Sequence, residues 1–188
     1  MINYEKDSFY HRFASQGIVQ SQNRARGGAN AWQPRCGGIS RLFGRAADES
    51  GIEFPAPESV IDVRAKVADA DALWIFSPEY NYSYPGHLKN LIDWLSRPLV
   101  PGDRQTPIAI NGKKVTLSGA GGASQTAKCR EKLTELLTLP FIRADVMTEP
   151  QAGITLNKEA WTEGCLILTD EQKSDLRLQA EAFLCFIG

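Results

Sequence analysis

A loop rich in tyrosine holds the residue types best suited to chemistry in this chain. Residues 77–86 read Ser-Pro-Glu-Tyr-Asn-Tyr-Ser-Tyr-Pro-Gly and directly follow an apolar run. Pro78 lacks an N–H and has a fixed φ, so the loop leaves the run in one direction and exposes the backbone N–H groups that follow. Asn81 adds an amide, and Tyr80 adds a flat apolar surface. This set suits a flat ring with acceptor atoms on its rim, such as an isoalloxazine; the alternative is an aromatic loop packed on its own domain.

A glycine cluster forms a second candidate site for a ligand. Ser118 is followed by Gly119, Gly121 and Gly122, and glycine lets backbone approach a ligand closely because it has no Cβ. The spacing matches neither a Walker phosphate loop nor the dinucleotide-binding fingerprint, so the cluster by itself equally fits a plain strand-to-helix turn. What matters is that both loops follow predicted strands. Since ligands of parallel sheets bind beyond the carboxyl ends of the strands, we expect the two loops to lie side by side.

The elements that must position these loops alternate along the chain. Helical periodicity predicts helices over residues 57–70, 87–96, 123–139 and from residue 169 onward. Short apolar runs predict strands over residues 72–76, 113–118 and 144–148, and residues 150–164 are expected to form a loop. Because parallel strands need long crossovers, this alternation predicts a three-layer α/β/α sandwich around a parallel sheet.

The composition fits one globular domain and excludes several classes of partner. The chain has 188 residues, of which 43% are hydrophobic, and a formal net charge of −1. That charge gives no field that would gather nucleic acid or an anionic membrane surface. No apolar run reaches the about 18 residues that span a bilayer, so we expect a cytoplasmic protein without a membrane partner. Four separated cysteines without a Cys-x-x-Cys pair, and two isolated histidines, predict neither a metal site nor a redox dithiol.

The first fifty residues depart from the rest of the chain. Six arginines and no acidic residue occur from Arg12 to Arg45, and two glycine pairs interrupt any periodicity. We predict that residues 1–50 form an aberrant, poorly ordered segment in which the first strand and its loop are degraded or absent, followed by the domain at residues 51–188. The abrupt change near Gly51 suggests a rearranged or frame-shifted segment. The alternative is a basic arm for an anionic partner.

The chain resembles a known family in the region around both loops. The 22 residues from Ser77 to Pro98, together with residues 113–122, look like the signature of the NADPH-dependent FMN reductases, which include chromate, quinone and azo-dye reductases. The likeness extends over residues 52–187. It implies a flavodoxin-like fold in which FMN is held around its ring by Pro78, Glu79, Tyr80 and Asn81, with Ser118, Gly119, Gly121 and Gly122 at the opposite rim.

The same resemblance implies the reaction and the partners. NADPH would donate a hydride to bound FMN, and a small electron acceptor such as a quinone, free flavin, azo compound or chromate would then take the electrons. The flavin does the chemistry, so no catalytic side chain is assigned. The resemblance further implies a homodimer or homotetramer.

The departure from the family lies at the phosphate-binding motif, Gly-Ser-x-Arg-x-x-Ser-x-Asn. Only Ser8 matches it in this chain. Losing two or three hydrogen bonds to a charged phosphate would weaken flavin binding about a hundredfold or more. Three alternatives therefore remain: a non-enzymatic relic with impaired flavin binding, a flavodoxin-type electron carrier, and an interaction protein that uses the arginine-rich segment.

Overall fold

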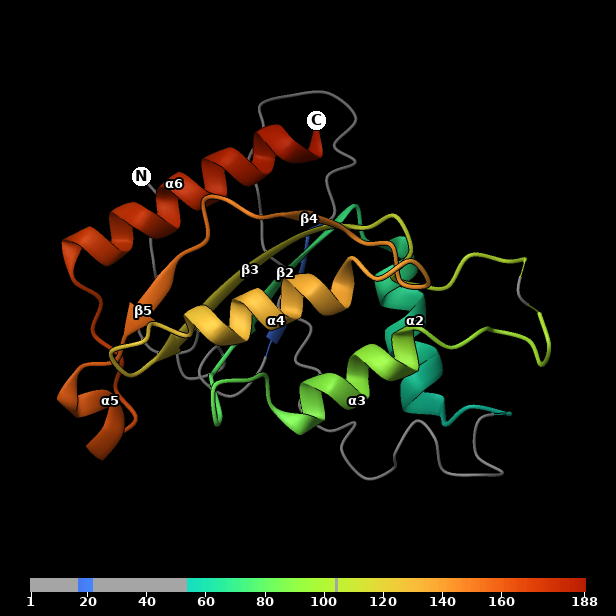
Figure 1. Cartoon of the computed structure of the whole chain (residues 1–188), viewed down its shortest axis with the longest axis horizontal. Coiled ribbons are helices and arrows are strands. Elements are labelled where there is room, and N and C mark those ends of the chain that lie inside the picture. Colours follow the sequence, from blue (N-terminus) through green and yellow to red (C-terminus); the bar gives the residue numbers. More distant parts are fainter. Residues whose placement is uncertain (1–16, 22–53, 104) are drawn as a thin grey trace.

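The computed structural model describes residues 17–21, 54–103 and 105–188 (Figure 1). Ser8 and the arginines between residues 12 and 45 lie outside these ranges, as does most of the segment expected to be aberrant. From α2 to β4, helices and strands alternate in the order that the sequence predicts. The described elements have these bounds: β1 Gly17–Ser21, α2 Glu58–Asp69, β2 Ala72–Ser77, α3 Gly86–Leu95, β3 Lys114–Gly121, α4 Ala127–Leu137, β4 Asp145–Met147, β5 Gly153–Thr155, α5 Lys158–Thr162 and α6 Asp170–Ile187.

The sheet is built around β3. Parallel pairing joins β2 to β3 from Ala72 opposite Lys114 to Ser77 opposite Gly119. On its other side β3 pairs in parallel with β4 near its start and with β5 near its end. The predicted parallel sheet is therefore confirmed for these four strands. The remaining strand, β1, pairs antiparallel with β2, although the sequence predicted no strand there.

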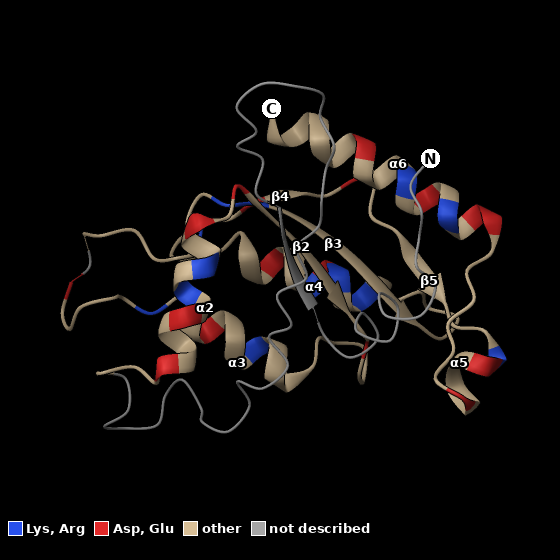
Figure 2. Ribbon diagram, turned by 180° about the vertical axis from the view of Figure 1, so that it is seen from behind, with Lys and Arg blue, Asp and Glu red and all other residues tan. Residues whose placement is uncertain are grey.

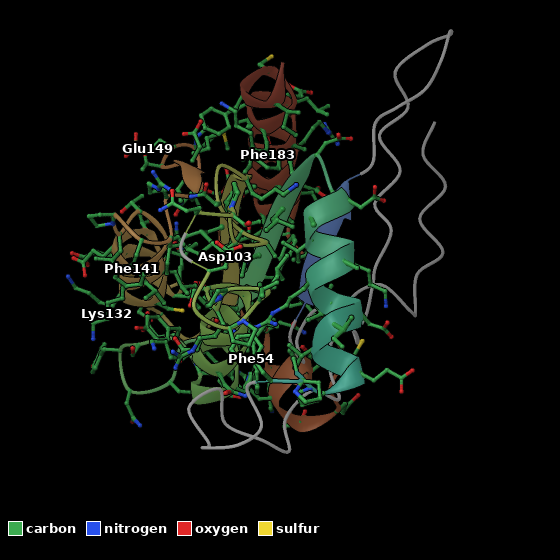
Figure 3. The ribbon with its side chains drawn as sticks, turned by 90° about the vertical axis from the view of Figure 1, so that its right-hand side faces the viewer. Phe54, Asp103, Lys132, Phe141, Glu149 and Phe183 are labelled. Carbon is green, nitrogen blue, oxygen red and sulfur yellow. The ribbon has the colours of Figure 1, made fainter. Side chains whose placement is uncertain are left out.

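Helices cover both faces of the sheet, which confirms the predicted three-layer sandwich (Figure 1). Side chains alternate along a strand, so β2 sends Leu73 and Ile75 into a large core with α2, α3 and α4. Trp74 points to the opposite face and packs with Phe183 of α6, which Figure 3 labels. The four longer helices, α2, α3, α4 and α6, thus each bury an apolar face against the sheet.

Helix starts follow ordinary capping chemistry at two places that the sequence identified. Pro57 precedes the first residue of α2, and Glu58 places a negative charge in the first turn. Thr169 begins α6 with a capping box: its hydroxyl accepts a hydrogen bond from the Gln172 N–H, and the Gln172 side chain accepts one from the Thr169 N–H. These local signals explain why both helices begin close to the predicted residues.

Two predictions about local structure are wrong. Residues 150–164 are not a loop, because they contain β5 and α5. The glycine cluster does not end β3, which continues through Gly121 because its last residues pair with β5. Ser118, Gly119 and Gly121 are therefore strand residues, and the turn that follows them begins at Gly122.

The charged residues of the described part are mixed in sign. Figure 2 shows Lys and Arg alternating with Asp and Glu along α2 and α6. Among the described residues, no helix is both long enough and apolar enough to cross a bilayer. The described ranges also contain no cluster of three or more His, Cys, Asp or Glu side chains arranged to hold a metal ion.

Candidate functional site

The two loops that the sequence singled out leave neighbouring strands at the same edge of the sheet. Ser77 ends β2 directly opposite Gly119 of β3 in a parallel pair. Because β3 continues to Gly121, the loop after β2 and the turn after β3 begin two residues apart along the sheet, as neighbours at the carboxyl ends of parallel strands. This adjacency is the geometric condition for one ligand to contact both loops.

The first loop folds back into a tight turn over residues 80–83. The Tyr80 N–H donates to the Ser83 carbonyl at 2.9 Å, and the Ser83 N–H donates to the Tyr80 carbonyl at 3.0 Å. Both central residues have positive φ, 51° at Asn81 and 57° at Tyr82, as in a type I′ turn. The expectation that all N–H groups after Pro78 are open to a ligand is wrong for Tyr80, because its N–H is used inside the turn.

The turn presents flat and polar groups to solvent. Tyr80 is 56% exposed and Tyr82 is 70% exposed, and Asn81 between them is exposed as well. Left-handed backbone is unfavourable for a tyrosine, and such strain is characteristic of functional sites. Exposed aromatic surface beside a free amide is the combination expected for binding one face and one edge of a planar ring.

The second turn is held against β3 by close packing at glycine. A Cβ placed on Gly119 would collide with the Thr126 side chain and lie 2.5 Å from the Ser77 carbonyl oxygen. Gly121 has the Thr126 methyl group 3.0 Å from the position that its Cβ would take. These two glycines therefore make room for the protein's own turn. Only Gly122, which is exposed with no atom within 4 Å of a built Cβ, leaves space for an external ligand.

The Glu79 carboxylate links the two loops. Its Oε1 accepts a hydrogen bond from the Ser124 hydroxyl at 2.8 Å, and its Oε2 accepts one from the Cys129 backbone N–H at 2.9 Å. Cys129 lies in the first turn of α4, where backbone N–H groups have no partner within the helix. Because a carboxylate already neutralises this helix end, an anionic phosphate would be repelled there.

The Ser118 side chain lies on the face of the sheet that α6 covers. Its hydroxyl donates to Gln179 Oε1 of α6 at 2.7 Å and accepts from Trp74 Nε1 at 2.9 Å. The residue is 1% exposed. The structure therefore brings Pro78, Glu79, Tyr80, Asn81 and the glycines together at one edge, whereas the Ser118 hydroxyl is engaged away from it.

Sequence reasoning missed the residues that hold the loops in place. Ser124 and Cys129 contact Glu79, and Thr126 packs on Gly119. The only signal in the sequence was position, since all three lie between the end of a strand and the first turn of a helix. Hydrogen bonds over 45 and 50 residues of chain separation leave no periodic pattern that could reveal them.

The Cys129 thiol is buried beneath the first loop, and this leads to a testable prediction. Burial is the largest effect that raises the pKa of Cys129, and the nearby Glu79 charge adds to it. Since the thiolate is the reactive form, we expect Cys129 to resist alkylation in the folded protein at neutral pH, whereas the exposed Cys165 and Cys185 react. Mass mapping of alkylated peptides before and after unfolding checks this. Labelling of Cys129 as fast as Cys165 would contradict the buried placement.

The exposed groups of the described residues match the chemistry of an isoalloxazine ring. Tyr80 supplies a flat surface, Asn81 an amide, and Gly122 an open backbone position. All three are exposed at the sheet edge where the loops meet. Ser8, the residue predicted to reach the FMN phosphate, lies outside the described residues, so the phosphate contact stays a prediction.

Comparisons with known proteins bear on this site. A family model described as NADPH-dependent FMN reductase matches residues 39–158. An NAD(P)H-dependent FMN reductase of Pseudomonas aeruginosa is 31% identical over 131 residues, which are 70% of this chain and 66% of that protein. A quinone reductase of Escherichia coli is 39% identical over 105 residues, which are 54% of this chain and 51% of that protein. The chain thus spans between half and two thirds of the length of these relatives.

A solved structure agrees with the fold. FerB, a flavoenzyme NAD(P)H:(acceptor) oxidoreductase from Paracoccus denitrificans, superposes with a TM-score of 0.63 at 29% identity, covering 79% of this chain and 76% of that one. The predicted flavodoxin-like architecture is confirmed by this likeness. The division of the chain at residue 51 stays a prediction. Since the family model matches more than half of the chain, the protein belongs to the NADPH-dependent FMN reductase family.

Proposed function

We propose that this protein is an NAD(P)H-dependent FMN oxidoreductase that passes electrons to a small acceptor. The observation that carries the proposal is the exposed Tyr80-Asn81-Tyr82 turn, which lies beside Gly122 at the carboxyl end of two neighbouring parallel strands. Open α/β sheets bind their ligands at this edge. Relatives that carry the same reaction in their names support the same assignment.

Each residue of the site has a role in binding and orientation. Tyr80 would face the ring with its apolar surface, Asn81 would hydrogen-bond a carbonyl or nitrogen on its rim, and the Gly122 backbone would approach the opposite side. Pro78 sets the direction in which the chain leaves β2. FMN, when bound, supplies the chemistry of accepting a hydride from NAD(P)H and releasing electrons to the acceptor. The protein needs no acid or base of its own for that transfer.

The proposed acceptor class rests on the exposure of Tyr80 and Tyr82 at this edge. A quinone, free flavin, azo compound or chromate could reach a flavin ring that lies against an exposed turn. We propose a homodimer or homotetramer as the assembly and the cytoplasm as the location. Neither changes the roles of the residues above.

The flavodoxin-type carrier is the strongest competing function. A carrier that docks to protein partners uses a strongly charged surface for steering. The helices that Figure 2 shows carry interleaved charges of both signs, and the whole chain has a net charge of −1. This arrangement favours a small-molecule acceptor over a protein partner.

Steady-state turnover tests the proposal. The purified protein, supplied with FMN and a benzoquinone, should oxidise NADPH at a rate proportional to protein concentration. Omission of FMN from flavin-free protein should abolish that rate. An electron carrier would bind FMN without oxidising NADPH, and a relic would do neither, so either result would contradict the proposal.

The Tyr80 side chain offers a prediction about affinity. Tyr80→Ala removes the flat surface, and a stacked aromatic pair contributes about 0.5–1.5 kcal/mol beyond area burial. With the buried area included, we expect the FMN dissociation constant to rise about tenfold. Phe141→Ala is the matched control, since Phe141 is 64% exposed but lies in the connection before β4, which runs beside the start of β3 at the opposite edge of the sheet. Equal affinities for wild type and Tyr80→Ala would exclude Tyr80 from the site.

A further inference from the structure

Both oxygens of the Glu79 carboxylate accept hydrogen bonds from the protein, although the residues next to Glu79 face the proposed ligand. One oxygen accepts from Ser124 in the turn after β3, and the other accepts from the Cys129 N–H in α4. A side chain that accepts hydrogen bonds with both oxygens from two other segments has little freedom to contact a ring. Its influence on a ligand must therefore be exerted through the segments that it joins.

The start of α4 depends on this contact because the helix has no side-chain cap of its own. Thr126 occupies the N-cap position with a left-handed backbone, φ 59°, and makes no side-chain capping hydrogen bond. Glu79 supplies from another part of the chain what an aspartate at the N-cap would supply locally. The negative charge also suits the positive end of the helix dipole.

A second contact fixes the same stretch of loop on α4. The Cys129 thiol lies 3.4 Å from the Pro78 carbonyl oxygen and 3.4 Å from the Ser77 hydroxyl oxygen. Residues 77–79 are thus held on α4 by both the backbone and the side chain of Cys129. The thiol bonds are weak, so the charged Glu79 contact is the stronger part of this attachment.

These contacts define the spacing between the two loops. Glu79 directly precedes the turn at residues 80–83, and Ser124 lies two residues after Gly122. A shift of either loop along the sheet edge would stretch the bonds at Glu79. Ligand affinity rises when binding groups are held in place before the ligand arrives, because less conformational entropy is then lost.

We propose that Glu79 is a positioning residue that fixes the distance between the Tyr80-Asn81 turn and the Gly122 turn, and that flavin affinity depends on it without contact between its carboxylate and the ring. The inference rests on the proposed function for its affinity consequence. The coupling of the two loops by Glu79 does not depend on a bound ligand.

Three variants at Glu79 and Ser124 distinguish this positioning role from simple helix capping. Glu79→Ala removes both hydrogen bonds, and we expect the FMN dissociation constant to rise about tenfold or more. Glu79→Gln keeps an oxygen for the Cys129 N–H and an amide that can donate to the Ser124 hydroxyl, so it should restore affinity to within about threefold of wild type. Ser124→Ala should give an intermediate value.

A matched control addresses stability alone. Leu136→Ala removes a partly buried side chain that packs on the core in the last turn of α4, at the other end of the helix from the turn that Glu79 contacts. Measured at a temperature where every variant is folded, it should leave FMN affinity unchanged. If Glu79→Ala binds FMN as tightly as wild type, or Leu136→Ala weakens binding equally, Glu79 acts only as a structural cap and the inference is overturned.

Hydrogen exchange in the flavin-free protein tests whether Glu79 couples the two loops. In the flavin-free protein, Glu79→Ala should accelerate exchange in residues 80–83 and 122–126 together, whereas Leu136→Ala should not. Acceleration confined to the first turn of α4 would overturn the coupling. If wild type binds no FMN but the two loops still respond together, the proposed function fails and the coupling stands, so the two failures can be told apart.

Discussion

Replacing Gly119 by alanine is expected to lower the free energy of unfolding by about 3 kcal/mol or more. The added Cβ would overlap the Thr126 side chain and press against the Ser77 carbonyl oxygen at 2.5 Å. Backbone oxygen cannot move without disturbing the β2–β3 pairing, and Thr126 is fully buried. The loss of stability should therefore be much larger than that caused by replacing an exposed glycine in a strand. Urea unfolding followed by circular dichroism measures it.

Gly122→Ala is the matched control for this prediction. No atom lies within 4 Å of the position of its Cβ, and the residue is exposed. Its stability should stay within about 0.5 kcal/mol of wild type. Thr126→Gly combined with Gly119→Ala should recover part of the loss, because one of the two colliding groups is removed. A Gly119→Ala protein as stable as Gly122→Ala would show that the second turn does not pack on β3 as described.

Gln179→Leu is expected to cost about 2–4 kcal/mol of stability. The Gln179 side chain is fully buried and uses all of its hydrogen-bonding groups. Its Oε1 accepts from the Ser118 hydroxyl and the Ala152 N–H, both at 2.7 Å, and its Nε2 donates to the Thr116 hydroxyl at 2.7 Å and the Leu117 carbonyl at 2.8 Å. Leucine fills similar space but leaves the buried Ala152 N–H without its acceptor.

The neighbouring Leu178 supplies the control for Gln179. It lies on the same helix and is 55% exposed, so Leu178→Ala should change stability by no more than about 0.5 kcal/mol. Thermal unfolding of both variants, with the midpoint and enthalpy measured, gives the comparison. Equal stabilities would mean that α6 is not tied to β3 by this network. FMN affinity of folded Gln179→Leu should stay near that of wild type, because the network lies on the face opposite α4.

Much of the fold could be predicted because its long elements carry their own periodicity. The apolar run at residues 72–76 and the helical spacing of Leu88, Leu91, Ile92 and Leu95 both survive in the structure as β2 and α3. The three-residue β5 could not be predicted, because it is defined by pairing with Gly119–Gly121 rather than by any pattern of its own. The same pairing extended β3 beyond the point where glycines suggested an end.

The adjacency of the two loops could also be predicted, since it follows from parallel strands alone. The form of the first loop could not. Type I′ turns are usually signalled by Asn-Gly, and here tyrosine occupies the second left-handed position at Tyr82. The roles of Glu79 and Ser118 were equally hidden, because whether a polar side chain faces a ligand or the protein depends on long-range contacts that the sequence does not display.

Hydrogen exchange with and without saturating FMN tests the central claim most directly, because it reports both binding and location. We expect added FMN to slow exchange at residues 78–83 and 122–126, while residues around Phe141 at the opposite edge stay unchanged. Absence of any protection at saturating flavin, or protection confined to residues away from the ends of β2 and β3, would contradict the assignment of this edge as the flavin site.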